Sequence, residues 1–421
     1  MFYKPTKPET GHIWDTWLYL HEGVYYLYYL AATRRPTPDQ PWDNTSVATS
    51  TDGVHWTEVG PVLVKKPEAT WMGTGSTWAN PTPERGGSSG GKKFQMNFSE
   101  WTGPRQTIFL AESDDLLTWT RLGDELEFVQ DERWYHPEGR WDCIWTIDRP
   151  GGGLYGYWTA TANNETNGQF GFGESDDGLK WTALKPPVVY GFDKPDAGGE
   201  VGAIEKLGDT YIMMFGYGQM HTLLADGPAG PFHMAQTNTK LLGGHTYFSR
   251  FLATDDDLLV NHHSICRDGD VYMAPLKRAV MDDDGAIRLM YWPGNEALKG
   301  EMFDVAPPTA ACDTGAAMLP TTFDAECGFI LEGDLGLPAS GAPARGLYIE
   351  CAPGSGSAIL VSGDGVATLG DMSADGSAWE ELFTEDRECA FGRPARFRLM
   401  LQRDLLEFYL DDVLIECFSL P

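Results

Sequence analysis

A short unit recurs along the chain at a nearly constant interval, and this repeat constrains the fold more than any other feature. It reads Ser50-Thr-Asp-Gly-Val-His-Trp56, then Glu112-Ser-Asp-Asp-Leu-Leu-Thr-Trp119, then Glu174-Ser-Asp-Asp-Gly-Leu-Lys-Trp181, so the tryptophans lie 63 and 62 residues apart. A degenerate fourth copy ends at Phe232, and a fifth unit closes near Trp292. An aromatic strand precedes most copies. Such a period indicates several copies of one β unit arranged as a repeat structure.

Five four-stranded units predict a five-bladed β-propeller. The second strands of the blades are expected at residues 25–29, 94–98, 155–159, 211–215 and 258–263. The Asp-Gly and Asp-Asp turns suit hairpins in the outer half of each blade, and the tryptophan that follows is expected to pack between blades. In a propeller the first strand of every blade lines a central channel, so side chains of the first strands face a common axis.

The pattern changes after the fifth unit. Residues 305–320 are small and rich in proline, which is typical of a linker, whereas the remainder alternates in short strands. This alternation predicts an antiparallel β-sandwich. We therefore expect an all-β chain with a propeller over residues 1–304, a linker over 305–320 and a sandwich over 321–421. The sandwich strands are expected at residues 328–332, 346–351, 357–361, 396–402, 405–410 and 413–418.

Composition limits the classes of partner. A formal net charge of −30 disfavours nucleic acid and anionic membranes, which would be repelled. The first residues lack the apolar core of a signal peptide, and no apolar run is long enough to span a bilayer. Seven scattered cysteines without a Cys-x-x-Cys pair suit a reducing, cytoplasmic location. Nucleotide fingerprints are absent and the possible metal motifs are incomplete, so no cofactor and no metal are expected. The oligomeric state stays open.

Three acids occupy comparable places when the expected hairpins are aligned by their second strands. Asp15 and Glu200 each lie 11 residues before a tyrosine of that strand, and Asp142 lies 13 residues before one. The turn at 151–153 absorbs the difference. Three carboxylates from three blades are thus predicted to meet at one mouth of the channel. Their repulsion and burial should raise at least one pKa, which suits general-acid catalysis, and paired carboxyls are typical of glycoside hydrolysis.

Four segments, taken in order, resemble glycoside hydrolase family 32. They are Ile13-Trp-Asp-Thr-Trp17, Trp71-Met-Gly-Thr-Gly-Ser-Thr77, Arg140-Trp-Asp-Cys143 and Gly199-Glu-Val-Gly-Ala203. They are similar to the family's Trp-Met-Asn-Asp-Pro-Asn-Gly, Trp-Ser-Gly-Ser, Arg-Asp-Pro and Glu-Cys-Pro motifs. The segment 406–414 looks like the closing hairpin of the family's sandwich. The chain departs from the family in lacking Asn before Asp15 and Cys-Pro after Glu200.

The resemblance implies roles for these residues. Asp15 would be the nucleophile and Glu200 the acid/base. Asp142 would hold sugar hydroxyls and stabilise the transition state. The reaction would retain configuration at the anomeric carbon. Neighbouring side chains that we expect to bind substrate are Trp14, Trp17, Trp71, Ser76, Trp78, Arg140, Trp141 and His245.

The expected function is therefore an exo-acting hydrolase of a small oligosaccharide or glycoside, with β-fructofuranosides as first choice. The broken motifs keep arabinofuranosides and galactofuranosides open. The chain also resembles the neighbouring family 43, whose arabinan- and xylan-acting members invert configuration. A non-catalytic sugar-binding propeller is a further alternative. A propeller scaffold for protein partners is another, and it predicts a plugged channel with the acids held in salt bridges.

Overall fold

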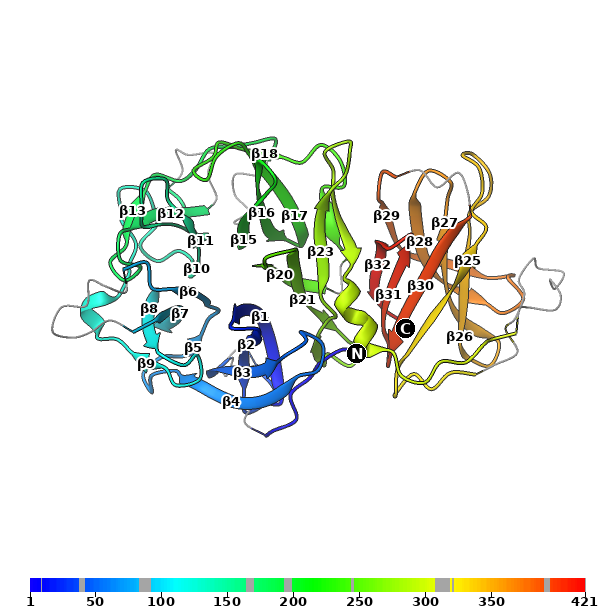
Figure 1. Ribbon diagram of the computed structural model, residues 1–421, viewed down its shortest axis with the longest axis horizontal. Coiled ribbons are helices and arrows are strands. Elements are labelled where there is room, and N and C mark those ends of the chain that lie inside the picture. Colours follow the sequence, from blue (N-terminus) through cyan, green and yellow to red (C-terminus); the bar gives the residue numbers. More distant parts are fainter. Residues whose placement is uncertain are drawn as a thin grey trace.

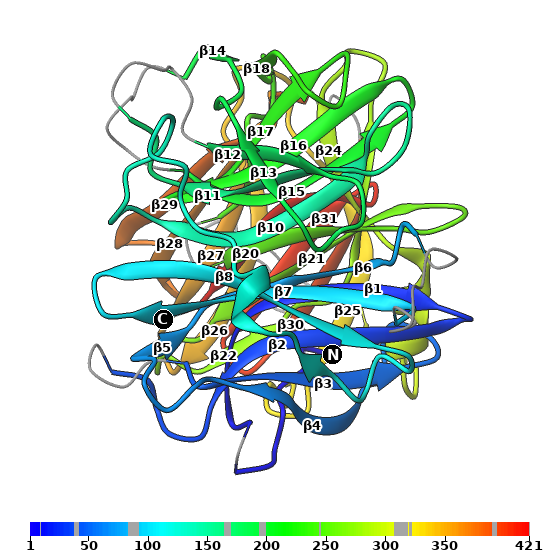
Figure 2. The same ribbon diagram turned by 90° about the vertical axis from the view of Figure 1, so that its left-hand side faces the viewer.

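The computed structural model describes residues 1–8, 10–37, 42–82, 92–163, 170–192, 199–243, 246–306, 319, 322–389 and 394–420. Over these residues the chain is almost entirely β-structure, with short 3₁₀ turns between strands. A propeller and a β-sandwich lie side by side (Figure 1). Figure 2 views the molecule from the propeller side, with the sandwich strands behind. The expected fold class is confirmed.

Each blade is built around a meander of antiparallel strands, as the repeat predicts. The first blade contains β1 (His12–His21), β2 (Val24–Ala32), β3 (Asn44–Ser50) and β4 (Thr57–Val64). The second contains β5 (Trp71–Met72), β6 (Ser76–Ala79), β7 (Phe94–Thr102), β8 (Arg105–Ser113) and β9 (Thr120–Arg121), followed by the 3₁₀ turn η2 (Asp124–Leu126). The third contains β10 (Trp141–Asp148), β11 (Leu154–Ala160), β12 (Phe170–Ser175) and β13 (Thr182–Leu184).

The last two blades carry small additions. The fourth contains β14 (Val189–Tyr190), β15 (Glu200–Leu207), β16 (Thr210–Tyr217), β17 (Gln219–Ala225), β18 (Phe232–Met234) and β19 (Lys240–Leu242). The fifth contains β20 (Thr246–Ala253), β21 (Leu258–Ile265), β22 (Val271–Met273), β23 (Lys277–Met281) and β24 (Ile287–Tyr291). All five expected second strands are confirmed as β2, β7, β11, β16 and β21.

The innermost strands of the five blades close into a ring. Strand β1 contacts β6 and β20, and β10 contacts β6 and β15, which in turn contacts β20 (Figure 1). Four of these strands carry a break in register near their first residues, for example between Ile13 and Thr16 on β1. In the second blade the inner strand is split into β5 and β6, which both pair with β7. The backbone is thus irregular at a similar place in every blade.

The repeated Ser-x-Asp turn has the same hydrogen bonds in three blades. In the second blade the Ser113 hydroxyl donates to Asp115, whose Oδ1 accepts the backbone N–H groups of Leu117 and Thr118. The residue after the acid is left-handed, which Gly53 and Gly178 adopt at low cost and Leu116 adopts at φ 64°. The repeat therefore encodes a turn. The tryptophan that follows packs between blades, as Trp119 does against Tyr28.

The sandwich consists of two antiparallel sheets. One contains β25 (Phe329–Leu335), β30 (Ala395–Gln402), β31 (Leu405–Leu410) and β32 (Val413–Ser419), and β32 pairs with β24 of the fifth blade. The other contains β26 (Arg345–Ala352), β27 (Ser355–Val361), β28 (Val366–Ser373) and β29 (Trp379–Asp386). Sequence analysis missed β28 and β29. Strand β29 reads Trp-Glu-Glu-Leu-Phe-Thr-Glu-Asp, and its acids are mostly exposed, so the sequence shows no alternation of apolar and polar residues there.

Part of the segment between the fifth blade and the sandwich is described. After β24 comes the 3₁₀ turn η3 (Pro293–Leu298), and the next strand begins at Phe329. Most of the expected linker, residues 305–320, lies outside the described residues, so the domain boundaries stay a prediction. The six described cysteines are free. No helix among the described residues is long and apolar enough to cross a membrane.

Candidate active site

The three predicted acids lie on inner strands of three blades. Asp15 is on β1, Asp142 is on β10 and Glu200 is the first residue of β15. Each stands beside the break in register of its strand. The charges of Glu200 and Asp142 both act on the carboxyl of Asp15. The structure therefore brings together the three acids that the alignment of hairpins selected.

Asp15 accepts a hydrogen bond on only one of its two oxygens from the described residues. The Thr74 hydroxyl donates to its Oδ2 at 2.5 Å. Its Oδ1 is buried and has no hydrogen-bond partner among the described residues. Burial raises the pKa of Asp15 to about 7, with a contribution from the charge of Glu200, and the Thr74 hydrogen bond opposes this shift. Asp15 thus changes charge near neutral pH.

Arg140 joins the other two acids. Its Nη1 lies 2.7 Å from Glu200 Oε1, and its Nη2 lies 3.3 Å from Asp142 Oδ2. The Ser99 hydroxyl donates to Asp142 Oδ1 at 2.6 Å, and Gln106 in turn donates to that hydroxyl. Burial raises the pKa of Asp142, although Arg140 and Ser99 act in the opposite direction. Arg140 remains 39% exposed and Glu200 28% exposed, so the site reaches solvent.

Two residues of the fifth blade complete the surroundings. The Tyr247 hydroxyl donates to Glu200 Oε2 at 2.6 Å, and its ring passes over Gly216, where a Cβ atom would come within 2.3 Å of the hydroxyl oxygen. Arg250 is fully buried and donates to the backbone carbonyls of Val201 and Gly202. Its charge lowers the pKa of Asp15. The guanidinium therefore ties β20 to β15 beside the acids.

The second blade contributes close packing rather than an acid. A Cβ atom on Gly73 would lie 2.2 Å from Ser99 Oγ and 2.8 Å from Asp142 Oδ1, distances that no side chain permits. A Cβ atom on Gly75 would lie 2.0 Å from the carbonyl oxygen of Asn97. The two glycines of the Gly73-Thr-Gly segment let the backbone approach the acids and place the Thr74 hydroxyl against Asp15.

Four residues expected to bind substrate belong to the core instead, which corrects the prediction. Trp17 and Trp141 are 0% exposed and Trp78 is 5% exposed. Their indole N–H groups donate to Thr77, the Phe128 carbonyl and Gln95, respectively. Ser76 is buried and donates to the carbonyl of Ile144. These rings have no free face for a sugar, because they pack within and between blades.

The remaining predicted residues differ in their placement. Arg140 lies between the acids, as described above. Trp14 is half-buried, with its ring stacked on Trp42 at 5.6 Å. Trp71 is also half-buried and stacks on Trp101 at 5.8 Å. His245 lies outside the described residues. Within the described ranges, no group of His, Cys, Asp and Glu is placed to hold a metal ion.

Sequence analysis missed several polar residues around the acids. They are Thr74, Ser99, Gln106, Tyr247, Arg250 and His263. Two of them have a visible signal, because Thr74 and Tyr247 occupy the positions in the second and fifth blades where other blades carry an acid. Ser99 and Gln106 lie on the hairpin of β7 and β8 and reach Asp142 only through the packing of blades. No spacing in the chain indicates this.

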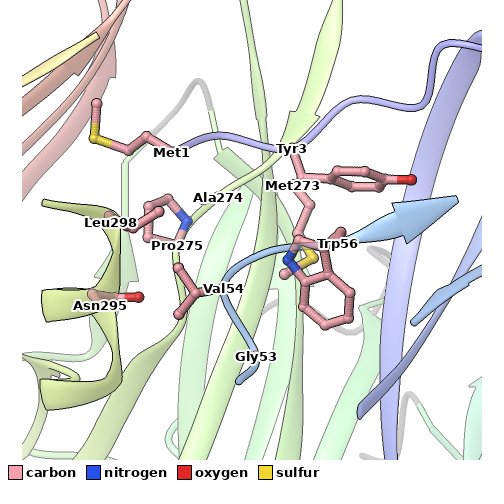
Figure 3. Close-up of a pocket in the computed structure, with 10 residues that line it drawn as sticks. All are labelled: Met1, Tyr3, Gly53, Val54, Trp56, Met273, Ala274, Pro275, Asn295 and Leu298. Atoms are coloured by element: carbon pink, nitrogen blue, oxygen red, sulfur yellow. The ribbon is translucent and has the colours of Figure 1, made fainter. Parts of the chain in front are cut away.

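Two hollows were found near the first strand. One is a cavity of about 10 Å³ between the N-terminal segment and the first and fifth blades, lined by Met1, Tyr3 and Trp56 among others (Figure 3). It has room for about one water molecule and not for a sugar. The other is a cleft of about 180 Å³ lined by Lys4, His12, Trp14, Arg35, Trp42 and Asp270. It begins beside Trp14, directly before Asp15 in the chain.

A five-bladed propeller followed by a β-sandwich is the architecture of glycoside hydrolase family 32 enzymes, and the chain has this fold. It is similar to fructan 1-exohydrolase IIa from Cichorium intybus, with a TM-score of 0.68 and 12% identity over 99% of this chain and 90% of that one. It is also similar to sucrose-6-phosphate hydrolase from Lactobacillus gasseri, with a TM-score of 0.66 and 14% identity over 94% of this chain and 82% of that one. A family 32 β-fructofuranosidase from Bombyx mori gives a TM-score of 0.62 and 15% identity over 97% and 86% of the two chains. No family model and no curated protein sequence matches the chain, so these similarities establish the fold.

Proposed function

We propose that this protein is an exo-acting glycoside hydrolase of small furanosides, with β-fructofuranosides as the first choice. The observation that carries the proposal is the meeting of Asp15, Asp142 and Glu200 from three blades, in a site that reaches solvent at Glu200. Structural neighbours support the choice of sugar. One is a fructan exohydrolase solved in complex with 1-kestose, and another is a fructofuranosidase solved with fructose.

In the first step, an ionised oxygen of Asp15 attacks the anomeric carbon of the furanose. A bond forms between that oxygen and the carbon while the glycosidic bond breaks. The carboxyl of Glu200 gives its proton to the departing oxygen. Asp142, held by Ser99 and Arg140, accepts hydrogen bonds from sugar hydroxyls. Desolvation in the buried site strengthens each of these interactions.

In the second step, the carboxylate of Glu200 takes a proton from water, whose oxygen attacks the same carbon. The bond to Asp15 breaks, the sugar is released and both acids return to their starting forms. The first step requires Asp15 as the carboxylate and Glu200 as the protonated acid. Burial and the neighbouring acids raise the pKa of Asp15 to about 7, so the free protein loses the reactive form as pH falls below about 7.

A cleft lies next to Trp14, the residue before Asp15 in the chain, although none of the three acids lines it. The stacked rings of Trp14 and Trp42 form part of its wall. Aromatic rings of this kind pack well against sugars. A cytoplasmic location remains part of the proposal, on the basis of the cysteine pattern.

The test is release of monosaccharide from a panel of fructosides, arabinofuranosides and galactofuranosides. Wild type should release one sugar, whereas Asp15→Asn and Glu200→Gln should not. Asp148→Asn is the matched control, because Asp148 lies at the far end of the same strand as Asp142 and is exposed. Nuclear magnetic resonance of the first product would show retained configuration.

The outcomes separate the alternatives. Release of arabinose or galactose would move the proposal to that furanose, and inverted product would remove Asp15 as nucleophile. Binding of a sugar without turnover would support a sugar-binding propeller. Full activity of Glu200→Gln on a true substrate would contradict the assigned acid/base.

The salt bridges of the acids bear on the alternative of a scaffold for protein partners. Asp142 and Glu200 do form salt bridges, as that alternative predicts. Asp15 has no Lys or Arg within salt-bridge distance in the described part of the chain.

A further inference from the structure

A buried histidine on β21 lies close to the proposed nucleophile. His263 is on β21, directly opposite Tyr247 of β20 in the ladder, and is fully buried. Its Nδ1 lies 3.9 Å from Asp15 Oδ1. Among the described residues neither atom has a hydrogen-bond partner. Two buried polar atoms this close without partners are costly, and a hydrogen bond between them would satisfy both.

The position of His263 is held from several sides. Its ring lies 4.5 Å from the ring of Trp14 and 6.2 Å from that of Tyr247, whose hydroxyl bonds Glu200. Two residues earlier on β21, the Asn261 side chain donates to the carbonyl oxygen and the hydroxyl of Thr16, the residue after Asp15. This anchor fixes β21 against β1 in register.

We propose that His263 is a positioning residue for Asp15, donating from Nδ1 to Oδ1 of the ionised carboxylate at a distance that shortens when substrate is bound, while Thr74 holds Oδ2. This inference rests on the proposed function of Asp15 as nucleophile. Catalytic hydrogen bonds are often long in the free enzyme and shorten in the complex with substrate. Two donors, one on each oxygen, fix the plane of the carboxylate and direct one lone pair at the anomeric carbon.

The charge state of the histidine is consistent with this role. Burial lowers the pKa of His263 to about 3, so the ring is neutral and carries one N–H group. Other groups that act on Asp15 are Glu200, Asp142 and Arg250, each from a different inner strand. None of these supplies a hydrogen bond to Oδ1. Among the described residues, His263 is placed to supply this donor from β21.

Three variants test the contact. His263→Phe keeps a ring but removes the donor, and kcat should fall about ten-fold or more. His263→Asn restores an N–H group at the δ position and should recover most of the activity, whereas His263→Gln, with its amide one atom further out, should not. His262→Phe is the matched control. His262 is the buried neighbour on β21, and its Nε2 lies 3.9 Å from Glu407 in the sandwich, away from Asp15.

A readout that a merely structural role would not change is the pH profile. Loss of a donor to the ionised carboxylate raises the pKa of Asp15, so the acidic limb of the profile should move to higher pH in His263→Phe and stay in place in His262→Phe. Equal activity and equal profiles for His263→Phe and wild type would overturn the inference. Equal activities of His263→Asn and His263→Gln would also overturn it. This second comparison still tests the inference if His263→Phe fails to fold.

A stability measurement keeps this inference separate from the proposed function. The free energy of unfolding should depend on pH over a wider range in His263→Phe than in wild type, and this difference should vanish in an Asp15→Asn background. If wild type releases no sugar but this coupling is found, the contact exists and the proposed reaction is wrong. If sugar is released without the coupling, the reaction is right and the contact is not made.

Discussion

Arg140 Nη1 lies 2.7 Å from Glu200 Oε1, so a cation of the third blade is paired with an acid of the fourth. The same guanidinium reaches Asp142 at 3.3 Å and offsets the repulsion between the two carboxylates. Replacing Arg140 with Met removes both contacts and should lower activity on the order of 10²-fold. Arg149→Met is the control, because Arg149 pairs with Glu174 and Asp176 on the outer part of the third blade. Equal activities of these two variants would show that Arg140 is dispensable.

The Thr74 hydroxyl is predicted to control the ionisation of Asp15. Thr74→Val keeps the shape of the side chain and removes the donor to Oδ2, so the pKa of Asp15 should rise above about 7. Activity at neutral pH should fall about 10- to 100-fold, because a hydrogen bond to a charged group is lost. Thr74→Ser retains the hydroxyl and should behave as wild type. The pH dependence of kcat/KM checks this prediction, and an unshifted acidic limb in Thr74→Val would contradict it.

The contribution of Asp15 to stability should fall as pH rises from about 4 to about 7. The folded pKa of Asp15 is raised from 3.8 to about 7, so the folded state holds this proton more tightly than the unfolded chain does. The contribution of Asp15 to stability is then fully present below about pH 4, declines up to about pH 7 and is constant above it. Glu200→Gln and Asp142→Asn remove charges that raise the pKa of Asp15, so they should narrow the pH range over which its contribution to stability changes. Asp15→Asn should remove this contribution. Urea unfolding at several pH values measures the effect.

A buried ion pair is predicted to couple the sandwich to the propeller. Lys277 Nζ of β23 lies 2.5 Å from Glu407 Oε1 of β31, and both side chains are 0% exposed. The Tyr409 hydroxyl donates to the other oxygen of Glu407 at 2.6 Å. Lys277→Met leaves a buried carboxylate without its cation and should cost about 3–5 kcal/mol of unfolding free energy.

The double variant Lys277→Met with Glu407→Leu should recover much of that loss, because no charge is then buried. Thermal and urea unfolding of the two single variants and the double variant form a complete cycle. Additive losses in the double variant would show that the two residues do not interact. Activity of the folded double variant should match wild type, since the bonds of this pair go to Pro275, Tyr409 and each other and not to the three acids.

The sequence was sufficient to predict the repeat, the blades and the three acids. Blade turns depend on residues close in the chain, such as Ser113 and Asp115, so their pattern is visible without a structure. The acids were found because each blade repeats its predecessor, which allows Asp15, Asp142 and Glu200 to be aligned. Strand β29 was missed because its side chains are mostly exposed and acidic, and alternation gives no signal there.

The tertiary structure decided which neighbours of the acids face the site. Trp17 and Trp141 stand one or two residues from an acid, yet both rings are buried in the core, because residues on either side of an irregular strand point in different directions. Ser99, Gln106 and His263 reach the acids from other strands, through the packing of blades. The chain by itself thus determined the architecture and the acids, through local patterns that repeat. Only the closed ring of inner strands determined their partners, because contacts between residues far apart in sequence leave no local pattern.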